Sequence, residues 1–161
     1  MIVMHINKEK KYLDSEAAVQ ANHIAGETGA VRDMNGLGSA LAAPQNMALY
    51  QGAGIVEQAA ILIQRIAQNH PFIDGNKRVA FILGSTFLMI NGYQIQYKDE
   101  QEEMALAYTI ESMVAEKKFE GLVQWLTTHL EACDDSAIWS VEQIMQQVAE
   151  EHPKIIAYLG S

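Results

Sequence analysis

The chain has 161 residues, a length that suits one domain with a hydrophobic core of useful size. Apolar residues make up 49% and charged residues 19%, which is ordinary for a globular protein and argues against wholesale disorder. The net charge is −9, from 20 acidic and 11 basic residues, so binding to a phosphate backbone gains little and we expect no nucleic-acid partner.

Three features indicate the compartment. Cys133 is the only cysteine, which excludes an intrachain disulfide and fits a reducing cytosol. At the N-terminus the apolar residues precede the charges, the reverse of a signal peptide. The longest apolar run, residues 79–90, is too short for a bilayer, which needs roughly 20 residues. We therefore expect a cytoplasmic protein without a membrane partner.

The first elements in chain order are an arm and a helix. Residues 1–12 suit a short strand or an irregular arm. The next segment predicts a helix from about Ser15 to Ala25, with Asp14 or Ser15 as its N-cap and Gly26 near its end.

A turn and a second, shorter helix should follow. Asn35 and Gly36 mark the turn, and the apolar residues from Leu37 onward indicate a short helix that Pro44 halts. Residues 45–54 contain two glycines and little periodicity, so they are predicted to form a loop long enough to be functional.

Two strongly apolar helices are predicted in the middle of the chain. Residues 55–70 show the three-four spacing of an amphipathic helix, which Pro71 ends. Another helix should begin near Asn76 and stop at Asn91-Gly92. Because this second helix is apolar nearly all round from Val79, it should lie at the centre of a bundle.

The remaining segments complete a nearly all-helical domain. Residues 93–97 alternate and suggest a short strand, and amphipathic helices are predicted over 99–117 and 119–133. A capping-box spacing at Ser140 introduces one more helix, which Pro153 ends.

The segment His70–Arg78 (HPFIDGNKR) concentrates polar chemistry between the two central helices. The backbone N–H groups at the start of the second helix favour an anion, whereas the cations Lys77 and Arg78 are unfavourable there by roughly 0.3–1 kcal/mol. A bound polyphosphate would offset that penalty. Asp74 would then hold Mg²⁺ against phosphate, and the neutral ring of His70 would accept a proton from an attacking hydroxyl. Phe72 should anchor the loop in the core.

Each of these residues also has a plain structural reading. Asp74 suits a helix N-cap, His70 a helix C-terminus, and Asn76 a cap or turn. Lys77 and Arg78 would ordinarily be solvated. These separate readings do not explain why a base, a carboxylate and phosphate-type groups converge on one helix start.

The motif resembles the signature of the Fic/Doc (Fido) superfamily, HPFx[D/E]GNxR, and Lys77 makes it similar to the death-on-curing (Doc) toxin branch. Typical Fic adenylyltransferases carry glycine at that position and a second arginine where this chain has Phe81. Residues 29–45 and 89–95 also resemble the Doc pattern, so the likeness covers roughly residues 12–127.

The resemblance implies an all-α, compact Fido-type helical bundle over residues 1–133, with a short flap or hairpin element. Residues 134–161 lie outside the likeness, and their apolar three-four spacing predicts a C-terminal helical extension packed on the same domain. By the resemblance, residues 45–54 would be the flap that clamps the target. The resemblance gives His70 as the catalytic base and Asp74 as the Mg²⁺ ligand. The ATP phosphates would bind to a cradle formed by Gly75, Asn76, Lys77 and Arg78.

The Doc branch is similar to kinases that move a phosphoryl group from ATP to a translation elongation factor, so the resemblance implies a toxin with a protein substrate. Two alternatives stay open: a Fic-type adenylyltransferase, and a non-catalytic module that binds a nucleotide or a partner. No inhibitory [S/T]xxxE[G/N] motif occurs in residues 1–40 or 128–161, which predicts a separate antitoxin chain.

Overall fold

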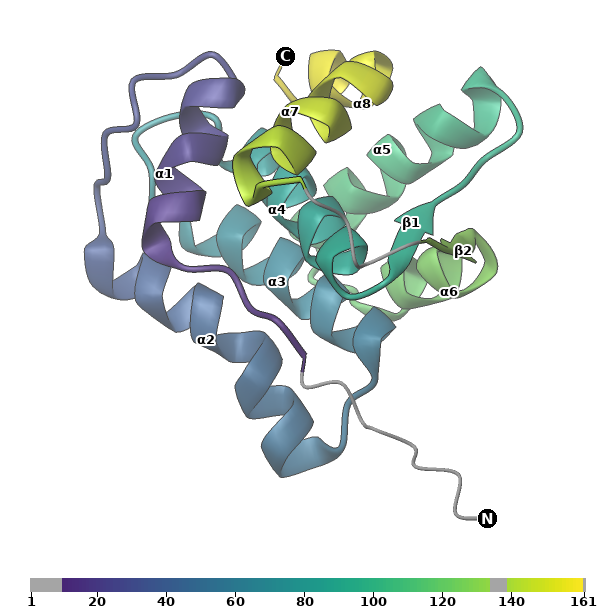
Figure 1. The fold of residues 1–161 in the computed structure, drawn as a ribbon, viewed down its shortest axis with the longest axis horizontal. Coiled ribbons are helices and arrows are strands. Elements are labelled where there is room, and N and C mark those ends of the chain that lie inside the picture. The colour runs from purple at the N-terminus through teal and green to yellow at the C-terminus, as the bar shows by residue number, and fades with distance from the viewer. Residues whose placement is uncertain (1–9, 134–138, 161) are drawn as a thin grey trace.

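The computed structural model describes residues 10–133 and 139–160 (Figure 1). In this part of the chain it contains eight helices and a sheet of two short strands. In chain order the elements are α1 (Ser15–Ile24), α2 (Met34–Gln51), α3 (Ile55–Asn69), α4 (Asn76–Ile90), β1 (Tyr93–Ile95), α5 (Glu100–Glu116), α6 (Glu120–Thr128), β2 (Leu130–Ala132), α7 (Val141–Glu151) and α8 (Pro153–Leu159). The prediction of an all-α bundle is confirmed.

Helix α4 is the centre of the bundle, as its apolar sequence predicted. It packs against α1, α3, α7, α8 and β1, and its residues from Val79 to Leu88 are all buried. The helix ends at Ile90 with Asn91 as its C-cap, and Gly92 follows with φ 95°, which confirms the predicted stop signal. This central place fixes the N-terminus of α4, where the motif lies.

The prediction that Pro44 halts a short helix is wrong, because α2 continues through it to Gln51. The expected loop and flap over residues 45–54 are therefore wrong for most of that segment. Proline costs about 3 kcal/mol inside a helix, but Pro44 is buried with Leu37, Ala40 and Ala43, and α2 packs along α3. Tertiary packing outweighs the local penalty, and only Gly52–Gly54 remains as the connection.

The predicted helix over 119–133 is too long, because α6 ends at Thr128. Residues Leu130–Ala132 instead form β2, which pairs antiparallel with β1. The presence of β1 confirms the short strand expected within residues 93–97. Nδ1 of His129 lies 2.7 Å from the carbonyl oxygen of Trp125, and the two rings stack at 3.9 Å. In a continued helix the His129 N–H would bond to the Trp125 carbonyl, but here the His129 ring occupies that carbonyl and the helix ends.

The C-terminal helices pack on the bundle. Ser140 and Gln143 form the predicted capping box at the start of α7. Helix α7 contacts α1 and α4, and α8 contacts α5 and α4. Pro153 ends α7 as expected but also begins α8, a short helix absent from the sequence analysis. The predicted arm over residues 1–12 lies mostly outside the described residues.

His152 joins α7 to α8 and is buried among side chains of other elements. Its Nδ1 lies 2.5 Å from Oη of Tyr97, and its ring meets the edge of Phe81 at 5.3 Å. Burial lowers the pKa of His152 below the ordinary value of 6.5, although the carboxylates of Glu151 and Glu103 act in the opposite direction. Burial also raises the pKa of Tyr97, so its hydroxyl stays protonated beside the imidazole.

We expect this histidine to make stability depend on pH. Below about pH 6.5 the unfolded chain binds a proton at His152 that the folded chain does not. The contribution of His152 to the free energy of unfolding therefore falls as the pH drops. Urea unfolding of the wild type and His152→Gln should show a stability difference that narrows between about pH 7.5 and about pH 5.5. A difference that stays constant over this range would contradict the assignment.

In the described part of the chain, no helix is both long enough and apolar enough to pass through a bilayer.

Candidate functional site

The loop between α3 and α4 begins at a strained residue. His70 caps α3 with φ 47° and ψ 54°, the left-handed region that costs a non-glycine residue about 1–3 kcal/mol. The following residue is Pro71, which further restricts the backbone at His70. Nη2 of Arg32 donates to the His70 carbonyl oxygen at 2.6 Å, and this bond helps to hold the conformation. The imidazole itself is exposed.

A neighbouring segment fixes the middle of the loop. The backbone N–H groups of Arg32 and Asp33 donate to the Pro71 carbonyl at 2.7 and 3.0 Å. Val31 forms an antiparallel bridge with Phe72, whose side chain is fully buried. Phe72 is therefore the core anchor that the sequence predicted.

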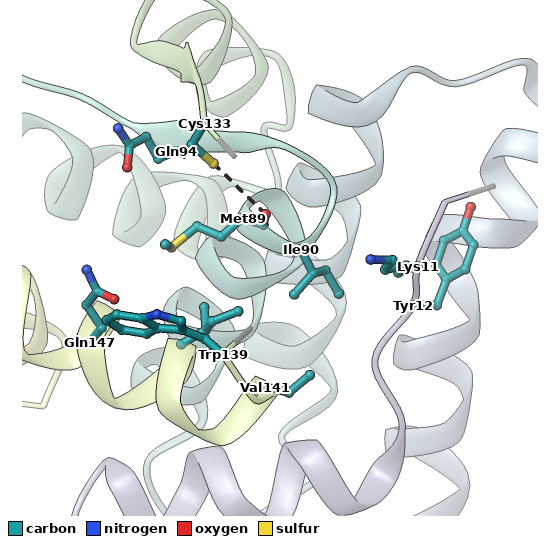
Figure 2. Close-up of a pocket in the computed structure, with 10 residues that line it drawn as sticks. Lys11, Tyr12, Met89, Ile90, Gln94, Cys133, Trp139, Val141 and Gln147 are labelled. Atoms are coloured by element: carbon teal, nitrogen blue, oxygen red, sulfur yellow. Dashed lines mark hydrogen bonds between the residues drawn. The ribbon is translucent and has the colours of Figure 1, made fainter. Parts of the chain in front are cut away.

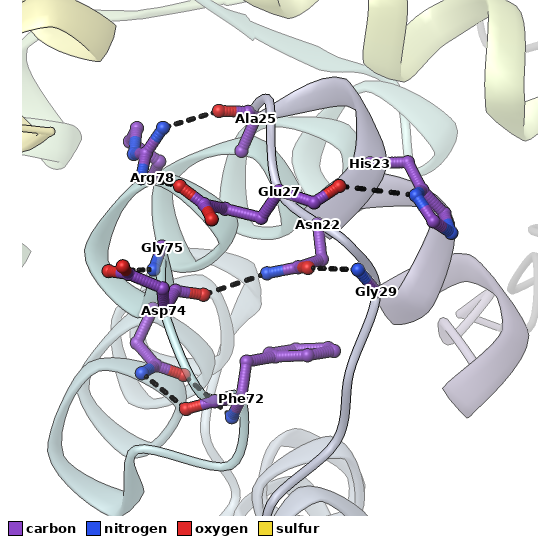
Figure 3. A network of polar contacts seen from close by, with 10 residues as sticks. Asn22, His23, Ala25, Glu27, Gly29, Phe72, Asp74, Gly75 and Arg78 are labelled. Atoms are coloured by element: carbon purple, nitrogen blue, oxygen red, sulfur yellow. Dashed lines mark hydrogen bonds and ion pairs between the residues drawn. The ribbon is translucent and has the colours of Figure 1, made fainter.

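Two buried amide side chains complete the loop (Figure 3). Oδ1 of Asn76 accepts from the Phe72 N–H at 2.9 Å, and Nδ2 donates to the Phe72 carbonyl at 3.0 Å. Nδ2 of Asn22 donates to the Asp74 carbonyl at 2.9 Å, while its Oδ1 accepts from Gly29 N–H at 2.7 Å. Because the Asn76 amide is engaged with Phe72, this residue would offer a ligand its backbone N–H instead.

Helix α4 begins with free backbone donors. Its N-cap is Gly75 at φ 78°, and the first intrahelical bond runs from Val79 N–H to Gly75 O at 2.9 Å. The N–H groups of Asn76, Lys77 and Arg78 precede that bond, and such helix N-terminal donors favour an anion. Oδ1 of Asp74 accepts from Gly75 N–H at 3.0 Å and makes no N-cap bond to α4, so the reading of Asp74 as a helix cap is not supported.

Gly75 also leaves room for a close neighbour. A Cβ at this position would lie 2.9 Å from Cγ of Glu27, in addition to the strain of its positive φ. Glu27 in turn pairs with Arg78 at 2.8 Å between Oε1 and Nη2. Nη1 of Arg78 donates to the Ala25 carbonyl, so the end of α1 holds this arginine (Figure 3).

The motif residues line a common cavity of about 270 Å³. Six of its lining residues are the predicted site residues, and three more come from the loop and the C-terminus. The full lining is His70, Ile73, Asp74, Gly75, Asn76, Lys77, Arg78, Leu159 and Gly160. An imidazole, a carboxylate, two cations and a helix N-terminus thus line one space.

Several residues of the site escaped the sequence analysis. Asn22 carried a weak signal, because it is a polar residue on the buried face of α1. The pairing of Glu27 with Arg78 and the wall formed by Leu159 and Gly160 carried none, since these contacts join distant parts of the chain.

A second cavity of about 360 Å³ lies at the other end of α4, between the arm before α1, β1 and α7 (Figure 2). Its lining is mainly apolar: Lys11, Tyr12, Met89, Ile90, Gln94, Cys133, Trp139, Val141, Ile144 and Gln147. It includes none of the motif residues and no convergent set of charged groups. The cavity at the start of α4 is therefore the candidate active site.

Comparison with known proteins supports the same region. The sequence model of the Fic/DOC family matches residues 12–88, which include the whole motif. The chain is also 42% identical over 88 residues to Toxin Doc of Mycolicibacterium smegmatis, an alignment that covers 53% of this chain and 68% of that protein. No solved structure matches the chain.

Proposed function

Because the chain belongs to the Fic/DOC family, we propose that it is a Doc-like toxin that moves the γ-phosphoryl group of ATP to a hydroxyl group of a target protein. The observation that carries this proposal is the convergence of His70, Asp74, Lys77 and Arg78 on one cavity at the start of α4. A translation elongation factor is the proposed target, and a separate antitoxin chain is the proposed restraint.

His70 acts as the general base in this reaction. Its exposed neutral imidazole accepts the proton of the target hydroxyl, whose oxygen then forms a bond to the γ-phosphorus. The bond between this phosphorus and the ADP oxygen breaks, and ADP leaves. Because the loop holds His70 in a left-handed backbone conformation, the direction in which its side chain leaves the chain is set before the substrates arrive.

The start of α4 stabilises the charge of the phosphates. The free N–H groups of the first helical turn bind phosphate oxygens, and Lys77 and Arg78 add positive charge beside them. Bound Mg²⁺ would neutralise part of the phosphate charge, and Asp74 is the residue that would hold it.

Two positions favour phosphoryl over adenylyl transfer. Lys77 places a long cation at the motif position where the adenylyltransferase pattern has glycine. Phe81 replaces the second arginine of that pattern and is fully buried in the core, so it offers the cavity no charge. Both differences remove features expected for the binding of a nucleotide with its α-phosphate at the target.

Labelled ATP tests the proposal directly. The protein is incubated with a bacterial extract, or with a purified elongation factor, and with ATP labelled at either the α- or the γ-phosphate. Label from the γ position alone, with the added mass of one phosphoryl group on the target, supports the proposal. Label from the α position with the mass of AMP establishes the adenylyltransferase instead, and no added mass on any protein favours a binding module.

We expect Mg²⁺ to bind well only together with nucleotide. Among the described residues no cluster of three potential metal-ligating side chains exists, and Asp74 alone is a weak site. Calorimetry should detect no tight binding of Mg²⁺ by itself, but clear binding of Mg²⁺ with ATP. Asp74→Asn should weaken this binding, whereas Asp99→Asn, the same charge change at the N-cap of α5, should not. Tight binding of the metal alone would contradict this expectation.

A further inference from the structure

Gly160 follows α8 and lies against the Arg78 side chain. Its φ is −89°, a backbone conformation open to every residue. A Cβ at Gly160 would lie 3.1 Å from both Cδ and Nε of Arg78, closer than an ordinary contact. The Ile156 carbonyl oxygen would lie 3.3 Å from the same Cβ, so a side chain at this position is crowded chiefly by Arg78 and not strained by its own φ.

The core fixes the place of Gly160. Ile155 and Leu159 lie four residues apart on one face of α8, and both are buried in the core formed with other helices. Since α8 packs against α5 and α4, its last turn is held at a set distance from the N-terminus of α4. Leu159 and Gly160 consequently form a wall of the motif cavity.

Arg78 is thus held from two sides. On one side, the Ala25 carbonyl and the Glu27 carboxylate, which follow α1, accept hydrogen bonds from its two terminal nitrogens. On the other side, Gly160 lies against its Nε. This Nε is buried and has no hydrogen-bond partner among the described residues. A phosphate oxygen would supply the acceptor once a small shift of the side chain opened this nitrogen to the cavity.

We infer that Gly160 is a positioning residue of the nucleotide site, and that the last turn of α8 sets the place of the Arg78 guanidinium at the cavity wall. The inference rests on the proposed function, because it takes the ligand to be a nucleotide phosphate. It assigns a role to a C-terminal segment that lies outside residues 12–88, where the family match ends.

The first test follows the NMR signal of the Arg78 side chain in the absence of nucleotide. The Nε–H signal of Arg78 in a nitrogen-15 correlation spectrum is identified by its loss in Arg78→Lys. It should shift in Gly160→Val and shift less in Gly160→Ala. Gly121→Val is the matched control, because Gly121 is exposed on α6 and a Cβ there meets nothing within 4 Å. An Arg78 signal that does not move in either Gly160 variant overturns the inference. If Gly160→Val does not fold, Gly160→Ala decides the result.

The second test measures the dissociation constant of Mg-ATP by calorimetry. Gly160→Val should raise it about 10-fold to 100-fold, the effect of losing a charged hydrogen bond, while Gly121→Val leaves it unchanged. In an Arg78→Ala background, Gly160→Val should add no further loss. An equal loss in both backgrounds overturns the inference, since the effect would not pass through Arg78. A wild type that does not bind Mg-ATP refutes the proposed function instead, and the arginine signal still decides whether Gly160 positions Arg78.

Discussion

Replacing His70 by asparagine is expected to lower the rate of target modification about 100-fold to 10,000-fold, the usual contribution of a general base. Asparagine tolerates the left-handed backbone of this position, so the loop should keep its shape. Its amide does not accept a proton at neutral pH. The dissociation constant of Mg-ATP should therefore stay near the wild-type value, while the rate of phosphoryl transfer falls by the factor given above.

His70→Ala separates the base from the backbone. It removes the same imidazole, but alanine adopts the left-handed conformation less readily than asparagine. We expect the same loss of rate as in His70→Asn and a lower free energy of unfolding. Single-turnover transfer with labelled ATP and urea unfolding measure the two effects. A His70→Asn protein that modifies its target at the wild-type rate would exclude His70 as the base.

Replacing Phe72 by alanine should cost about 3–5 kcal/mol of unfolding free energy, since it empties a fully buried aromatic site. The same change frees the loop that carries His70 and Asp74, so the rate of transfer should fall as well. Urea unfolding measures the stability, and labelled ATP measures the rate.

The adjacent Ile73 is the control for this prediction. Its side chain is 67% exposed, and Ile73→Ala should change stability by only about 0.5 kcal/mol or less. Two variants of neighbouring apolar residues thus separate the core anchor from the exposed part of the same loop. Similar losses of stability in both variants would show that Phe72 does not anchor the loop.

The sequence predicted those elements whose signals are local. The apolar periodicity of α3 and α4, the stop at Asn91-Gly92 and the capping box at Ser140 are all set by residues within a few positions of one another. The motif at the start of α4 is equally local, so its residues could be assigned to one site before any contact was known.

The differences arise where tertiary contacts outweigh local preference. Pro44 reads as a helix end, yet the packing of α2 on α3 carries the helix past it. Residues after Thr128 read as helix, yet β1 offers them backbone partners. The pairing of Glu27 with Arg78 spans 51 positions, and no sequence pattern links residues so far apart.

The middle of the motif loop, from Phe72 to Asp74, is held by neutral groups. Asn22 and Asn76 bind the loop through amide hydrogen bonds, which neither titrate nor weaken through ionic screening. The contact between Arg78 and Glu27 is ionic and is therefore sensitive to the salt concentration. Raising the ionic strength should thus loosen the Arg78 contact more than the part of the loop that Asn22 and Asn76 hold, so the two parts of the site should respond differently to salt.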